Sequence, residues 1–293
     1  MVSPTEVAQQ AIFGLGIGAV YALVGLGFSL IYRSTGMLSF VHPQFVMLGS
    51  VVGFTVTISW GVPLPLAVVP VGLFTGAVGY LIDQIGVRPI RRQGGQLISL
   101  ILATLGWGII VVTVVELAFG TDQRTYGTLS PPWTVFGLSV RWQMLVALAS
   151  ALVLVGLLRL FLLHTRQGRA VRAVGEDPST AALMGIDVER TMGLSAGIGG
   201  ALGGVAGILF GWLFFAGIAV DIVGFKSLAG AVIGGFGSLP GAVVGGVLVG
   251  VAENIFGLVF ETAWRDVFVF GSVIVVLLIR PRGLLGRREH VRT

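Results

Sequence analysis

The sequence predicts an all-α, polytopic inner-membrane helix bundle with eight or nine transmembrane segments, in a single domain that covers residues 1–293. The chain is 55% hydrophobic and only 11% charged, whereas a soluble domain has about 25% charged residues. Apolar runs of roughly 20 residues, the length that crosses a bilayer core of about 30 Å, recur along it. Its 46 glycines suit closely packed transmembrane helices.

Nine apolar segments follow one another, at residues 8–31, 37–57, 62–82, 97–117, 144–163, 191–213, 216–236, 241–261 and 266–281. The second contains His42 and Pro43, and proline interrupts helical hydrogen bonding. The seventh contains Asp221 and Lys226, which are costly in hydrocarbon. We therefore expect broken or re-entrant helices near 37–57 and 216–240.

Arginine placement predicts the orientation. Most arginines fall on one side of the membrane if the N-terminus is outside and the C-terminus inside. These are Arg33, Arg88, Arg91, Arg92, Arg166, Arg169, Arg172, Arg190, Arg280, Arg282, Arg287, Arg288 and Arg292. The positive-inside rule makes that side cytoplasmic. The polar segment 164–190 is then cytoplasmic, and the segment 118–143 lies outside.

Several function classes are excluded by what the chain lacks. It has no cysteine, and its only lysine, Lys226, does not follow a glycine-rich phosphate loop, so it cannot form a Walker A site. His42, His164 and His290 lie far apart and show no metal-ligand spacing. We predict no enzyme activity, no metal site, no cofactor in this chain and no nucleic-acid partner; membrane lipid is the expected environment.

Glycines recur at every fourth position in GIGGALGGVAGILFGW, at Gly199, Gly203, Gly207 and Gly211. This spacing places them on one face of a helix, where another backbone can approach closely. We interpret these four residues as helix-packing positions. The glycine-rich segment 234–246, with Pro240, predicts a sharp hairpin between two apolar runs.

Ionisable residues within apolar segments indicate either pairing inside the bundle or an aqueous route. Glu253 lies beside Asn254 in the middle of a segment, and Asp221 and Lys226 are close enough in sequence to neutralise one another. Both interpretations remain open at this point.

The polar segment 164–190 lies between two apolar segments and offers the best surface for a soluble partner. We expect it to be a loop with a short helix from about Pro178 to Gly185. Asp177 and Pro178 favour a helix start, and Gly185 favours its end.

Four long blocks of sequence resemble one known family, the integral membrane permeases of branched-chain amino acid ABC importers, specifically the H-type permease of the Liv system. The blocks are GLGIGAVYALVGLGFSLIYRSTGMLSFVHPQFVMLG (14–49), VRPIRRQGGQLISLILATLG (87–106), GRAVRAVGEDPSTAALMGIDVERT (168–191) and GFKSLAGAVIGGFGSLPGAVVGGVLVGVAE (224–253), followed by the RPRGLLGR tail. They span nearly the whole chain.

The resemblance implies a multi-pass subunit in the cytoplasmic (inner) membrane of a prokaryote. It implies three kinds of partner: a second homologous permease subunit, two cytoplasmic ATPase subunits that bind ATP and Mg, and an extracytoplasmic solute-binding protein. The ATPase-coupling element would comprise Arg172, Glu176, Asp177, Ser179, Ala181, Ala182, Met184 and Gly185. Ser179, Thr180 and Ala181 occupy the EAA positions of related permeases, so the usual glutamate is absent.

The sequence departs from the family in LSFVHPQ (38–44), where the family reads close to INFAHGE. The translocation path implied by the resemblance and by the intramembrane polar residues comprises Ser39, His42, Gln44, Lys226, Glu253 and Asn254. Branched-chain amino acids are the first expected substrate. Urea, short-chain amides or other organic solutes are the alternative, and a stand-alone channel or ion-coupled carrier is the alternative of a different class.

Overall fold

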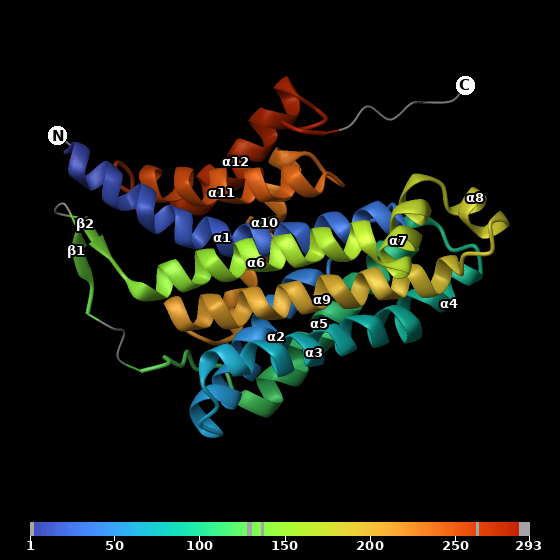
Figure 1. Cartoon of the computed structure of the whole chain (residues 1–293), viewed down its shortest axis with the longest axis horizontal. Helices are drawn as coiled ribbons and strands as arrows, with labels where there is room; N and C mark the ends of the chain where they lie inside the picture. Colours follow the sequence, from blue (N-terminus) through green and yellow to red (C-terminus); the bar gives the residue numbers. More distant parts are fainter. Residues whose placement is uncertain (1–2, 128–130, 136–137, 262–263, 287–293) are drawn as a thin grey trace.

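Long helices lie side by side along one axis of the molecule in the computed structural model (Figure 1). The structure describes residues 3–127, 131–135, 138–261 and 264–286. Arg287, Arg288, His290 and Arg292, which were used in the sequence analysis, lie outside the described residues. The arrangement confirms an all-α membrane bundle.

Among the described residues, six helical segments are long and apolar enough to cross a membrane. They are α1 (Pro4–Thr35), α3 (Leu64–Ile82), α5 (Leu97–Phe119), α6 (Trp142–His164), α9 (Val188–Leu213) and α11 (Leu239–Phe256). The third of the predicted spans is longer than expected, because α3 continues through the π-helical turn η2 (Asp83–Val87) into α4 (Arg88–Arg92).

Three further apolar helices are shorter: α2 (His42–Phe54), α10 (Asp221–Gly234) and α12 (Trp264–Ile279), of 13, 14 and 16 residues. At 1.5 Å per residue, α2 is about 20 Å long, less than a bilayer core. A π-helical turn, η1 (Thr55–Ser59), extends α2, and a 3-10 turn, η3 (Ile218–Val220), precedes α10. The predicted interruptions near 37–57 and 216–240 are therefore present.

The start of α2 shows how the first interruption is built. Gly36 ends α1 with a positive φ of 70° and donates its N–H to the carbonyl of Tyr32. The chain then enters the bundle without helical structure until His42. Pro43 lies in the first turn of α2, where a missing N–H costs no hydrogen bond. Pro43 thus begins a half-helix, and the interruption lies before it.

The two ends of the bundle differ. At one end, called here the hairpin end, lie the start of α1 and the antiparallel pair β1 (Trp133–Val135) and β2 (Leu138–Val140), in which Trp133 is paired with Val140. At the opposite end, called the α8 end, lie α4, α7 (Arg166–Glu176) and α8 (Pro178–Leu183) (Figure 1).

The segment 164–190 is more helical than the sequence predicted. The expected short helix is present as α8, but the residues before it form α7 in place of a loop. The reason is a helix cap, since the Thr165 side chain accepts a hydrogen bond from the Gly168 N–H and satisfies a free donor of the first turn.

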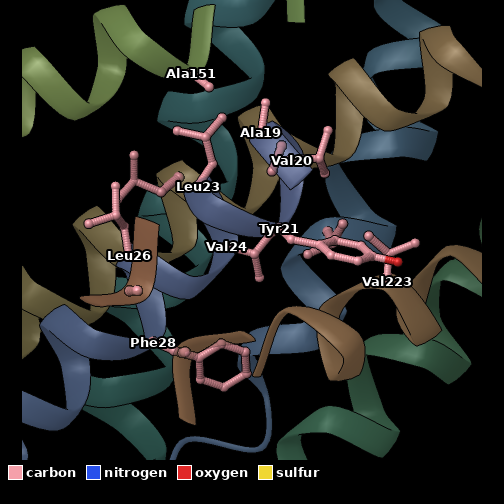
Figure 2. Packing of buried hydrophobic residues seen from close by; sticks show 14 of the residues in the cluster. Ala19, Val20, Tyr21, Leu23, Val24, Leu26, Phe28, Ala151 and Val223 are labelled. Carbon is pink, nitrogen blue, oxygen red and sulfur yellow. The ribbon is translucent and has the colours of Figure 1, made fainter. Parts of the chain in front are cut away.

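The centre of the bundle is α1, which packs against α6, α9, α10 and α11. Its residues from Gly18 to Ile31 are buried on all sides. Figure 2 shows Val20, Leu23 and Leu26 of this stretch, with Ala151 of α6 and Val223 of α10 among the surrounding residues. By contrast, only a minority of α3, α5 and α6 is buried, and their exposed large side chains are mainly apolar, as expected for surfaces that meet lipid or another membrane subunit.

The glycines of α9 lie where neighbouring chain segments approach closely. A Cβ on Gly207 would lie 2.0 Å from the carbonyl oxygen of Val46 in α2, and one on Gly199 would lie 2.7 Å from the Ile31 side chain of α1. Gly203 faces Phe45 and Gly211 faces the Tyr126 ring. Side chains at these positions would push α9 away from α1, α2 and the 120–127 segment.

Replacing Gly207 tests this packing. We expect Gly207→Ala to destabilise the protein by about 1–3 kcal/mol, the usual cost of overpacking. The melting temperature of detergent-purified protein should fall accordingly. Gly106→Ala is the matched control, because a Cβ at this helical glycine meets nothing within 4 Å and alanine favours the helix by about 0.5–1 kcal/mol. A Gly207→Ala melting temperature equal to that of the wild type would contradict the packing role.

Candidate functional site

The start of α8 is fixed by Asp177. Its carboxylate accepts hydrogen bonds from the Ser179 N–H at 2.9 Å and the Thr180 N–H at 3.2 Å, and both hydroxyls donate to it at 2.6 Å. These bonds, from the Ser179 and Thr180 side chains first, hold the pKa of Asp177 well below its ordinary value. Gly185, with φ of +82°, ends the turn after the helix.

One face of α8 is buried and the other is open. Ala181 packs against Val174 of α7 and Met192 of α9. Leu183 and Met184 project from the opposite face and are 88% and 79% exposed. Large apolar side chains at this level of exposure are uncommon on a surface outside the apolar spans.

Ion pairs connect this end of the molecule to the long helices. The Arg33 guanidinium at the end of α1 lies 2.7 Å from the Glu176 carboxylate at the end of α7. Glu176, predicted as a contact to an ATPase, therefore makes an internal contact. Arg172 of the same predicted set is half-buried, and its Nε has no hydrogen-bond partner among the described residues.

A second ion-pair group joins α9 to α4. Arg91 lies 2.8 Å from Glu189 in the first turn of α9 and 3.3 Å from the buried Asp83 of η2. Arg88 is 3.8 Å from Glu189. Both helices that flank α8 are thus bonded to other parts of the bundle, α7 to α1 and α9 to the η2–α4 segment.

A separate cluster of charged groups lies inside the bundle. The Lys226 ammonium of α10 is 2.6 Å from the Glu253 carboxylate of α11 and 2.6 Å from the Asp266 carboxylate of α12. The Tyr21 hydroxyl of α1 donates to the second Glu253 oxygen at 2.8 Å. Lys226 and Glu253 are almost fully buried, with side chains 11% and 6% exposed.

This cluster corrects the predicted pairing of Asp221 with Lys226. Lys226 lies one turn and a half into α10 and extends toward α11 and α12, while Asp221 makes no ion pair among the described residues. The sequence pointed to Lys226 and Glu253 because both are ionisable within apolar runs. It gave no signal for Tyr21, and Asp266 lies at the start of its apolar run, where charge is ordinary.

The other predicted path residues lie elsewhere. His42 is fully buried, with Nε2 3.1 Å from the Val24 carbonyl oxygen and its ring 4.3 Å from that of Phe28. Ser39 and Gln44 are buried near the start of α2, and Gln44 faces α5 at Gly108. The structure therefore brings Lys226 and Glu253 together, but not with the 39–44 residues. Asn254 lines a cavity at the hairpin end.

The fold and these sites define a class: a multi-pass membrane protein of the transporter type, with half-helices inside the bundle and a short capped helix, α8, at one end. Residues 10–278 match the family described as branched-chain amino acid transport system / permease component. The chain belongs to this family.

Curated relatives match along almost the whole chain. The high-affinity branched-chain amino acid transport system permease protein BraD of Pseudomonas aeruginosa is 36% identical, with 96% of each chain covered. LivH of Escherichia coli K12 is 34% identical, again over 96% of each chain. Among solved structures, an inward-facing protein described as a metal-chelate type ABC transporter has a TM-score of 0.50 at 18% identity, covering 93% of this chain and 87% of that one, which shows a shared fold.

The buried cluster makes a prediction about stability. Lys226→Met leaves the Glu253 and Asp266 carboxylates without their cation, and removing one partner of a buried ion pair costs about 3–5 kcal/mol. The melting temperature in detergent should fall strongly. The double variant Lys226→Met/Glu253→Gln should recover much of the loss, because no buried charge is then left unpaired on α10 or α11.

Asp266→Asn serves as the control for this cluster. Asp266 is 53% exposed, so water can replace its partner and the loss should be much smaller. A double variant no more stable than Lys226→Met alone would show that an unpaired Glu253 is not the cause of the loss.

Proposed function

We propose that this chain is the permease subunit of an ABC importer for branched-chain amino acids, and that ATP hydrolysis on partner subunits drives it through α8. The observation that carries the proposal is the geometry of α8: a capped helix at one end of the bundle whose Leu183 and Met184 are exposed while Ala181 is anchored. Membership in the permease family supports it.

The contacts around α8 provide a route by which a movement of α8 would reach the long helices. A displacement of α8 acts directly on α7 and α9, because Ala181 packs between Val174 and Met192. From α7 it reaches α1 through Glu176 and Arg33. From α9 it reaches α4 and η2 through Glu189 and Arg91. The permease helices would then move relative to one another and alternate access to the two sides.

Under this proposal, partner subunits supply the energy for the movement of the helices. A nucleotide site of the Walker type needs a lysine on its phosphates, and Lys226, the single lysine of the chain, is bound to Glu253 and Asp266. We propose two ATPase subunits at the α8 end, a second permease against the exposed apolar surface and a solute-binding protein at the hairpin end. ATP and Mg belong to the ATPases.

Branched-chain amino acids are the proposed substrate because the relatives are named for them. The alternative of urea, amides or other solutes was motivated by Ser39, Pro43 and Gln44, but these are buried against neighbouring helices. The channel or carrier alternative relied on His42, Asp221, Lys226 and Glu253. His42, Lys226 and Glu253 are occupied in internal contacts, and Asp221 forms no ion pair with another described residue. No observation favours either alternative.

Docking through α8 predicts a coupling defect. Leu183→Ala/Met184→Ala removes apolar side chains whose burial each contributes about 1.5–3 kcal/mol. We expect transport-coupled ATPase activity in proteoliposomes to fall about tenfold or more. The amount of ATPase that co-purifies with the permease should also fall. Leu97→Ala is the control, since Leu97 is also exposed and lies at the same end of the bundle outside α8. Wild-type coupling and co-purification in the double variant would contradict the docking role.

The proposed orientation, with the N-terminus outside and the C-terminus inside, has an independent test. The chain has no cysteine, so a maleimide reagent can label the protein only at a cysteine that is introduced by mutation. Both Ala182 in α8 and Thr134 in β1 are exposed. In intact cells a membrane-impermeant maleimide should label Thr134→Cys alone, and after permeabilisation it should also label Ala182→Cys. The reverse pattern would invert the orientation.

A further inference from the structure

A cavity of about 230 Å³ lies at the hairpin end, between the start of α1, the start of α6, the end of α9, the end of α11 and the start of α12. It is at the opposite end of the bundle from α8. None of the contacts proposed above for ATPase coupling uses it. Its lining contains two arginines and no acidic residue, which is unusual for a hollow among apolar helices.

The two arginines are Arg141, just before α6, and Arg265, in the first turn of α12. Neither has a carboxylate within ion-pair distance among the described residues. The Arg265 Nε is buried and has no hydrogen-bond partner in the described part of the chain. Guanidinium groups bind carboxylates strongly and with defined geometry, so two of them without a carboxylate indicate a place for an anionic group.

Two amides complement these cations. Gln143 is 2% exposed, and its Oε1 has no hydrogen-bond partner in the region described. Asn254 is 5% exposed and uses its Nδ2 to donate to the Gly250 carbonyl, which leaves Oδ1 as the acceptor. A buried acceptor without a donor is costly, so the Gln143 oxygen favours a ligand that donates hydrogen bonds, and the Asn254 Oδ1 offers a second acceptor beside the cavity.

The remainder of the lining is mainly apolar. Phe13 and Ile17 of α1, Met144 of α6 and Leu213 at the end of α9 contribute to it. The volume is below the roughly 300–1,000 Å³ of pockets that hold drug-sized ligands, so the occupant is a smaller molecule. A phospholipid could place its headgroup near the arginines, but its two acyl chains exceed this space.

From this arrangement we infer that the cavity is a binding site for a zwitterionic α-amino acid with an aliphatic side chain, on the side where substrate arrives. The carboxylate binds Arg141 and Arg265, the ammonium donates to the Gln143 and Asn254 oxygens, and the side chain packs on the apolar wall. The inference rests on the proposed function and adds to it the residues of the permease itself that bind the substrate.

The site is also connected to the charged cluster. Asn254 and Arg265 are the immediate neighbours of Glu253 and Asp266, which hold Lys226. A ligand that draws Arg265 into the cavity therefore acts on the same segments of α11 and α12 that carry the cluster.

Direct binding tests the inference without the solute-binding protein. The assembled permease–ATPase complex, purified in nanodiscs, is titrated with radiolabelled L-leucine by scintillation proximity. We expect saturable binding that Arg141→Gln/Arg265→Gln weakens at least tenfold. Unlabelled L-leucine should compete, whereas leucinamide, which lacks the carboxylate, should not. Arg124→Gln is the matched control, because Arg124 lies at the same end but outside the cavity and donates to the Phe119 carbonyl.

The outcomes separate the inference from the proposed function. ATP-driven leucine uptake by the complete wild-type importer, without leucine binding to the complex or with binding unaffected by the double variant, would overturn the site and keep the function. Leucine binding sensitive to the double variant, without uptake, would overturn the function and keep the site. Radiolabelled leucine that unlabelled leucine does not displace would be bound non-specifically, and this result would also overturn the inference.

Discussion

A helix that ends inside a bilayer must bury its free backbone groups in protein, and this constraint organises the bundle. The half-helix α2 starts at His42 between α1, α9 and α10, where His42 contacts the Val24 carbonyl and Pro43 meets Gly224. Such a start is feasible only if the surrounding helices approach closely. The glycines of α9 and α10 permit that approach, and α1 fills the centre from which the other helices are positioned.

The two ends of the molecule carry different chemistry, and the same helices reach both. At the α8 end, Leu183 and Met184 are exposed, and ion pairs join α7 to α1 and α9 to α4. At the hairpin end the arginines of the cavity are without carboxylates. Between them, α1 contributes Arg33 to one end and Phe13 to the other, and α9 contributes Glu189 and Leu213. A rigid helix of this kind can transmit a change at either end to the other.

Features that depend only on neighbouring residues in the sequence predicted the fold well. The length of an apolar run, a proline and a glycine each determine local helix formation without contacts from distant segments. The apolar runs, the interruption before Pro43 and the helix after Asp177 are all of this kind. The pairing of Lys226 was predicted wrongly, since its partners are 27 and 40 residues away on other helices, and sequence proximity favoured Asp221. Tyr21 and the cavity arginines were missed for the same reason: their roles exist only after α1, α6, α11 and α12 have packed. Helix α7 was missed because its start depends on the Thr165 cap.

The position of Lys226 also bears on how the protein is made. Lys226 leaves the ribosome before Glu253 and Asp266, and a lysine in the middle of a membrane helix costs about 2.5–3.5 kcal/mol during insertion. Helix α10 is short and cannot offset that cost alone. The last three helices should therefore enter the bilayer together, held back at the translocon until both carboxylates have been synthesised. Biogenesis of this subunit would then end in a single late insertion step of residues 221–279.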